Sequence, residues 1–231
     1  MDLPHRIELR PGSLMAHALK DLFRPPFAVL LLLDLLIFGA LSTGASDQVD
    51  DATLFGALVL TVVSAFVQIA LTLAATNEEP RSADEWVKLA FKHRVFWRFV
   101  LTTMVTIAAV LLGLLAFVVG GLVLGGVLGL SQTAAIQQRL WPGAALRKSI
   151  TLSQGHRWPI GIIFAVTFTL PNALMQTGAE LGWDGELGLA WDAAGALATV
   201  ATLVGVVALA RVYVALGGRS KETAPAATSP T

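Results

Sequence analysis

The chain of 231 residues is 55% apolar and only 14% charged, and its mean hydropathy is +0.70. Soluble domains carry about 25% charged residues, so this chain cannot cover a water-exposed surface and is expected in a bilayer. The formal net charge is zero, and no nucleic-acid partner is expected. The lack of cysteine excludes disulfides, thiolate nucleophiles and cysteine metal sites.

Six apolar stretches follow one another along the chain. A hydrocarbon core of about 30 Å needs roughly 20 apolar residues per helix. The stretches lack the alternation of barrel strands, so helices are expected. The fold class predicted is an all-α polytopic membrane protein with spans at residues 27–41, 54–75, 95–118, 122–140, 159–176 and 193–216.

Three shorter amphipathic stretches precede the first, third and fifth spans, at residues 14–24, 82–92 and 142–154. In the first, the side with Leu19, Leu22 and Phe23 is predicted to be apolar, and the side with Asp21 and Arg24 polar. Such segments are typical of helices that lie at a membrane interface. We therefore expect three interfacial helices.

Charge divides the connecting segments into two groups. All sixteen Lys and Arg lie in the N-terminal segment, at 77–98, at 139–157, or from Arg211 onward. The short segments 42–53 and 177–190 carry acidic residues and no Lys or Arg. Cytoplasmic segments are enriched in Lys and Arg, so both termini are predicted to be cytoplasmic in a bacterial inner membrane. Residues 1–218 form one predicted membrane domain, and 219–231 a disordered tail.

The three amphipathic stretches share an L-x4-R pattern, at 19–24, 89–94 and 152–157. One interpretation is an internal threefold repeat of an interfacial helix followed by a transmembrane hairpin. The alternative is that any cytoplasmic amphipathic helix ends in a basic residue before a span.

Residues 145–158 read A-L-R-K-S-I-T-L-S-Q-G-H-R-W, and Leu22-Phe23-Arg24 ends the first amphipathic stretch. This pattern resembles bacterial six-span proteins related to the membrane domain of glycerophosphoryl diester phosphodiesterases, and the YciC-like and DUF975-like families. The resemblance implies a membrane module without known chemistry. Two features depart from those families. Gly120-Gly121 replaces their proline between spans three and four, and no phosphodiesterase sequence follows within the chain.

Asp34 and Arg211 are predicted to lie at similar depth in the first and last spans. Ionisable residues at such depth are candidates for function. Three interpretations stay open. The two residues form a buried pair, or Asp34 bonds a neighbouring hydroxyl or backbone group while Arg211 reaches the cytoplasm, or Asp34 belongs to a proton or ion relay.

Other polar and small residues in the spans have less specific signals. Gln68 and Asn172 suit either interhelical hydrogen bonds or a lined cavity, and Pro171 suits a kink or a transporter-like break. Gly121, Gly125 and Gly129 form two G-x-x-x-G steps, which favour close helix packing within the chain or in an oligomer.

The basic segments are candidates for binding anionic lipid headgroups, because each cation near such a surface contributes about 1 kcal/mol. The residues concerned are Arg24, Lys92, Arg94, Arg98, Arg147, Lys148, Arg157 and Trp158. No catalytic motif, metal constellation or cofactor motif is recognised, so no cofactor is expected.

The function predicted is thus a non-enzymatic membrane module that binds lipid, other membrane proteins or its own copies, as a scaffold or in assembly. The alternative is a small transporter with a polar path near Asp34, Asn172 and Arg211.

Overall fold

The structure is a computed structural model that describes residues 10–43, 51–77, 82–92, 95–116, 118–181 and 189–218. Within these ranges the chain is helical and contains no β-strand. The helices are α1 (Pro11–Leu22), α2 (Pro25–Thr43), α3 (Asp51–Thr76), α4 (Ala83–Lys92), α5 (Val95–Ala116), α6 (Val118–Gln137), α7 (Pro142–Leu152), α8 (Arg157–Phe164), the π-helical turn η1 (Ala165–Thr169), α9 (Leu170–Glu180) and α11 (Leu189–Ala215).

Three helices are long and apolar enough to cross a membrane. They are Leu58–Thr76, Arg157–Glu180 and Ala190–Ala215. Shorter apolar helical stretches lie in α2, α5 and α6. Large apolar side chains of these long and shorter apolar helices face outward, for example Leu36 of α2, Phe55 of α3 and Leu197 of α11, which are 71%, 68% and 70% exposed. Outward apolar side chains of this size suit contact with lipid.

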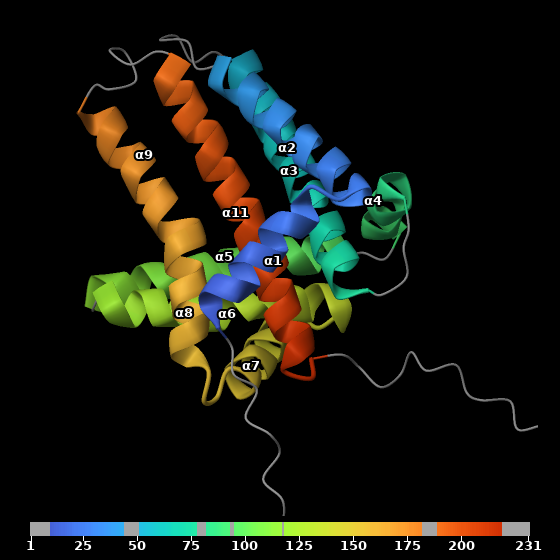
Figure 1. The fold of residues 1–231 in the computed structure, drawn as a ribbon, viewed down its shortest axis with the longest axis vertical. Helices are drawn as coiled ribbons and strands as arrows, with labels where there is room; N and C mark the ends of the chain where they lie inside the picture. The colour runs from blue at the N-terminus through green and yellow to red at the C-terminus, as the bar shows by residue number, and fades with distance from the viewer. Residues whose placement is uncertain are drawn as a thin grey trace, which may run out of the picture.

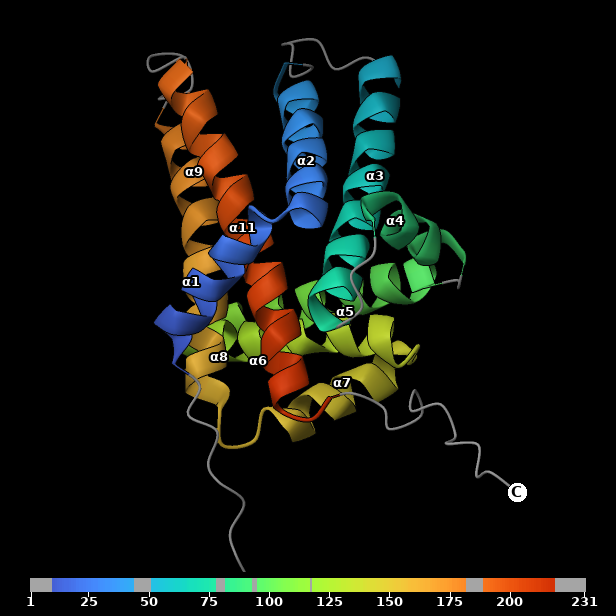
Figure 2. The same cartoon turned by 45° about the vertical axis from the view of Figure 1, so that its right-hand side comes forward.

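The long helices run in two directions. Helices α2, α3, α9 and α11 run roughly along the long axis, as Figures 1 and 2 show. The C-terminal ends of α2 and α9 lie at the same end of the molecule as the N-terminal ends of α3 and α11. Helices α5 and α6 instead lie across this axis, near the opposite end. The sequence predicts six equivalent spans and does not distinguish these two helices from the others. That α5 and α6 cross the membrane therefore stays a prediction.

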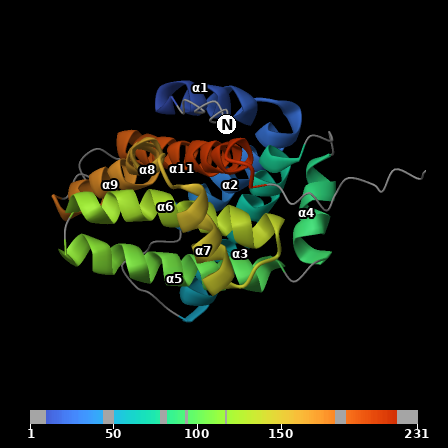
Figure 3. The same ribbon diagram turned by 90° about the horizontal axis from the view of Figure 1, so that it is seen from below.

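Helix α11 occupies the centre of the molecule. Seen from below, α1 lies on one side of α11, and α6 followed by α5 lies on the other (Figure 3). The largest core cluster is built on α11, where Leu203, Val207, Val212 and Tyr213 are fully buried. Packing around one apolar helix explains why that helix shows almost no amphipathic character.

The three predicted amphipathic stretches are helices α1, α4 and α7. Helix α1 packs on α11, α4 on α3, and α7 on α6. Helix α4 begins after Ser82, and a hydrogen bond from Ser82, with a second from Lys88, lowers the pKa of Asp84. Helix α4 also contacts α3 through two stacked rings, Phe91 and Phe66, whose centroids lie 3.9 Å apart.

The face assigned to α1 is partly wrong. Asp21, predicted on the polar side, is 3% exposed, whereas Leu19 and Phe23 are 42% and 67% exposed. The buried residues of α1 are Ala18, Asp21 and Leu22, which share one helical face. Asp21 can occupy that face because a cation from α11 meets it there, as described below.

The fifth predicted span is one nearly continuous helical segment, α8–η1–α9. Pro171 lacks an N–H donor, and the π-helical turn ends two residues before it. Asn172 Nδ2 donates to the Phe168 carbonyl at 2.6 Å, which supplies a donor to the local backbone. The described backbone thus stays helical past Pro171, without the unwound break that a transporter-like interpretation needs.

The order of one short helix and two long segments occurs three times along the chain. The second pair, α5 and α6, runs across the direction of the other two pairs. The threefold repeat therefore stays a prediction. The tail 219–231 and the acidic stretches 44–50 and 182–188 lie outside the described residues.

Candidate functional site

A buried carboxylate connects helix α1 to the central helix α11. Arg211 Nη2 forms an ion pair with Asp21 Oδ2, and Arg24 Nη1 lies 3.1 Å from Asp21 Oδ1. The Asp21 side chain is 4% exposed, against 36% for Arg211 and 61% for Arg24. A carboxylate is tolerated at this depth only with a compensating cation. The cluster therefore holds α1 in place across α11.

The buried pair of Asp34 with Arg211, the first of the three interpretations, is not formed, because each residue has another partner. Asp34 is buried on α2 and accepts a hydrogen bond of 2.7 Å from Ser64 Oγ of α3. Arg211 pairs with Asp21. The Asp34 contact is the hydroxyl bond that the second interpretation described. The sequence did not indicate Asp21 as the partner, although a cation in an apolar run demands one.

The polar path of the transporter alternative is not assembled by the described residues. Asn172 is exposed and bonds its own helix, while Asp34 and Arg211 have separate partners. Gln68 is half-buried on α3. Other amides join helices, as expected for polar groups in a bundle. Gln132 Nε2 donates to Thr103 Oγ1, Gln137 Nε2 to Thr76 Oγ1, and Gln138 Nε2 to the Gly218 carbonyl.

Close contacts place the glycines of α6 against α8 and α11. A Cβ on Gly125 would lie 2.4 Å from the Phe164 ring, and one on Gly129 would lie 3.0 Å from Leu209. Gly121 is buried. The tightest backbone approach is at Gly126, where a Cβ would lie 2.8 Å from the backbone of Gly161. The G-x-x-x-G pattern predicts close packing at Gly121, Gly125 and Gly129, but it contains no signal for Gly126.

The A-L-x-x-S-x-x-L-x-x-G-x-x-W segment forms the corner between α7 and α8. Ala145 and Ser149 are fully buried, and Ser149 Oγ donates to the Val127 carbonyl of α6. Gly155 has φ +82, a left-handed conformation that favours glycine. These three positions therefore fix how α7 crosses α6 and how the chain turns into α8.

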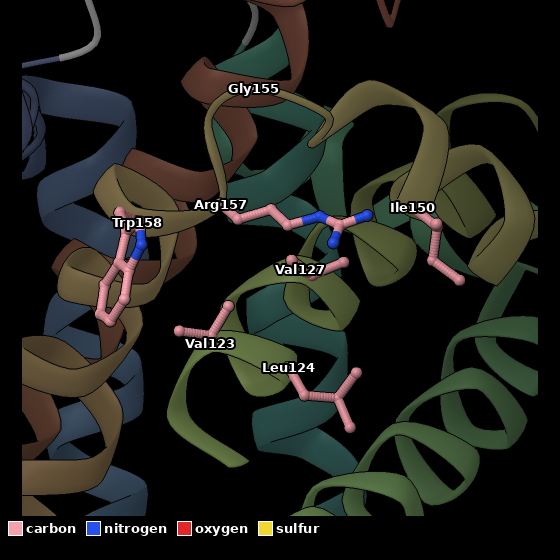
Figure 4. A pocket seen from close by; sticks show the side chains of 7 residues that line it. All are labelled: Val123, Leu124, Val127, Ile150, Gly155, Arg157 and Trp158. Atoms are coloured by element: carbon pink, nitrogen blue, oxygen red, sulfur yellow. The ribbon is translucent and has the colours of Figure 1, made fainter. Parts of the chain in front are cut away.

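A groove of about 750 Å³ lies at this corner, between α6, α7 and the start of α8. Its lining is mostly apolar, with a guanidinium among the apolar side chains (Figure 4). Trp158 is 65% exposed at its edge. The lining residues are Val123, Leu124, Val127, Ile150, Gly155, Arg157 and Trp158. The sequence indicated Arg157 and Trp158, but α6 could not be predicted as the opposite wall.

The other basic candidates have varied surroundings. Arg98 donates to the Arg139 carbonyl and lies 5.5 Å from the centre of the Trp141 ring, a cation–π geometry. Arg147 is exposed and Lys148 half-buried on α7. Lys92 ends α4, and Arg94 lies outside the described residues. The cations are thus distributed over several elements.

The ion pairs within the described ranges do not include Arg147, Lys148 or Arg157. No Asp or Glu occurs in the sequence between Glu85 and Glu180, which covers α5 to α9. The cations at the corner of α7 and α8 therefore have no ion-pair partner within the described part of the chain, and they lie beside an apolar groove. Among the described residues, no group of three His, Asp or Glu side chains is placed to hold a metal ion.

Comparisons with known proteins give no relative for this chain. No protein-family model, no curated protein and no solved structure matches it.

Proposed function

We propose that this chain is a non-enzymatic module of the bacterial inner membrane that binds anionic lipid or partner proteins at its basic end, in a scaffold or assembly role. The observation that carries the proposal is that Arg147, Lys148 and Arg157 at the α7–α8 corner form no ion pair with any part of the chain that the structure describes. Cations at a membrane surface attract anionic headgroups and acidic protein surfaces alike.

The fixed position of the interfacial helices supports the proposal. The ion pair of Asp21 with Arg211 holds α1, the stacked Phe66 and Phe91 rings hold α4, and the Ser149 bond holds α7. A surface held in place loses little conformational freedom when a ligand binds, which favours affinity. The resemblance of residues 145–158 to membrane modules without known chemistry supports a non-enzymatic role.

The proposal includes a membrane placement. The sequence predicts six spans, but the crosswise direction of α5 and α6 supports a different assignment. We place α2, α3, α8–α9 and α11 across the bilayer, and the α5–α6 hairpin within the basic-side leaflet. The number of crossings is even in both assignments, so both termini stay cytoplasmic, as the distribution of Lys and Arg favours.

The experiment compares lipids and proteins that stay bound to the full chain purified from native membranes. We expect anionic lipid to be enriched over the bulk membrane, or a partner to be captured by in-cell cross-linking. A triple variant, Arg147→Gln, Lys148→Gln and Arg157→Gln, is expected to lose this binding. The control Lys88→Gln, which removes a cation already paired with Asp84, is expected to keep it.

The proposal fails if the wild-type chain carries no enriched lipid and no cross-linked partner. It also fails if the triple variant, shown to be folded by its melting temperature, binds as the wild type does.

A further inference from the structure

The groove between α6, α7 and α8 has three features that together suit one class of ligand. Its floor is apolar, formed by Val123, Leu124 and Val127 of α6. A guanidinium, Arg157, extends along it between α6 and α7 (Figure 4). An exposed indole, Trp158, stands at its edge. An acyl chain suits the floor, and a phosphate suits the guanidinium.

The depth of the groove agrees with such a ligand. Arg157 and Trp158 begin the apolar segment Arg157–Glu180, one of the three helices long enough to cross a membrane. The first residues of a crossing helix lie at headgroup level, where amphipathic rings such as indole are enriched. The apolar floor then faces the outer part of the acyl region.

The segments that line the groove carry no acidic side chain of their own that would repel an anion. All three walls lie between Glu85 and Glu180, where the sequence has no Asp or Glu. Arg157 takes part in none of the ion pairs formed within the described residues. A phosphate at the groove would therefore meet an uncompensated cation, which is the form of charge complementarity that gives specificity.

Resting on the proposed function, we propose that this groove is a specific site for one anionic glycerophospholipid of the basic-side leaflet. Its phosphate binds Arg157, and an acyl chain lies along Val123, Leu124 and Val127. The volume of about 750 Å³ lies within the range of small-ligand sites.

The test uses the full chain in nanodiscs of phosphatidylcholine with a minority of phosphatidylglycerol. Native mass spectrometry counts the phosphatidylglycerol retained after transfer into detergent. The wild type is expected to retain one molecule. Arg157→Gln is expected to lower its occupancy about tenfold, the scale of a charge-assisted hydrogen bond.

Three further variants locate the site. Arg157→Lys is expected to recover part of the binding because the positive charge is kept. Val123→Phe, which fills the groove and leaves Arg157 in place, is expected to lose the lipid. Lys88→Gln removes an exposed cation of α4 that does not line the groove, and is expected to retain the lipid. Melting temperatures show that each variant is folded.

The outcomes separate this inference from the proposed function. If Arg147→Gln, which removes a cation of α7 outside the groove, reduces binding as much as Arg157→Gln does, the lipid binds the whole basic face, and the groove site is wrong while the proposed function holds. If Val123→Phe, folded, binds as the wild type does, the groove site is also wrong. If the wild type retains no phosphatidylglycerol and Arg157 instead cross-links to a protein, the ligand is a protein and the lipid site is refuted.

Discussion

Asp21 and Arg211 illustrate how single residues determine the position of a whole helix. The carboxylate of Asp21 is buried, and Arg211 is the cation that makes its burial tolerable. The pair therefore fixes the register of α1 on α11 as well as the depth of the charge.

Replacing Asp21 with Asn should destabilise the protein by roughly 2 kcal/mol, less than a fully buried pair because Arg211 keeps some solvent contact. The variant leaves the Arg211 guanidinium without its anion. The melting temperature in detergent measures the effect. The matched control is Asp84→Asn, which breaks the exposed pair with Lys88 and should leave the melting temperature nearly unchanged. Equal shifts for both variants would contradict the role given to Asp21.

Asp34 provides a second prediction, because Ser64 donates to its carboxylate. Asparagine also has an acceptor oxygen, so Asp34→Asn should keep the bond and the melting temperature. Ser64→Ala removes the donor and should cost about 1–2 kcal/mol. A large loss of stability in Asp34→Asn with none in Ser64→Ala would contradict this prediction. It would show that a cation, and not the Ser64 hydroxyl, is the partner that stabilises Asp34.

At the scale of elements, the crossing of α6 over α8 depends on the absence of side chains. The backbones approach at Gly126 and Gly161, close to the start of α8. Three residues along α6, a Cβ on Gly129 would lie 3.0 Å from Leu209, in the C-terminal part of α11. Through these contacts, α6 supports both α8 and the corner with α7.

Replacing Gly126 with Ala should therefore destabilise the protein by roughly 2 kcal/mol, because its Cβ would meet backbone atoms that cannot rotate away. Gly56→Ala is the control, since no atom lies within 4 Å of its Cβ position and alanine favours the helix. Thermal unfolding of both variants checks the prediction. An unchanged Gly126→Ala would mean that the two helices do not cross as closely as described.

The sequence indicates where the helices lie because prolines begin α2 and α7, at Pro25 and Pro142, and Gly217 follows the end of α11. Amphipathic stretches also differ clearly from apolar ones. It does not indicate the direction of α5 and α6, since helices that are apolar on all sides carry no signal for which neighbour they meet. The same holds for the groove. Arg157 and Trp158 were recognisable as interfacial residues, whereas the wall from α6 depends on the crossing at Gly126.

At the scale of the whole molecule, the distribution of charge supports the proposal that the two ends lie in different compartments. The ends of α2, α3, α9 and α11 next to the acidic segments lie together, opposite α7 and the C-terminal end of α11. Transfer of a Lys or Arg through a bilayer is costly, so in the proposed placement the basic end stays on one side of the membrane.

Because the chain has no cysteine, single cysteines report their own compartment without interference. Cysteines at Asp47 and Asp184 should react with an impermeant maleimide added outside intact cells. One at Ser220 should react only after the membrane is opened. Labelling of Ser220→Cys under the same conditions as Asp47→Cys would refute the sidedness.

A cysteine at Ala116, the C-terminal residue of α5, decides between the two placements of the hairpin. If α5 and α6 lie in the basic-side leaflet, Ala116→Cys stays unlabelled from outside while Asp47→Cys is labelled. If they cross the bilayer, as the apolar lengths alone predict, both positions react together. The first result would also explain the contacts of α6. A helix in the plane of the leaflet meets every crossing helix at one depth. Helix α6 indeed contacts α8 near the start of its membrane-crossing segment and α11 near the end of that helix.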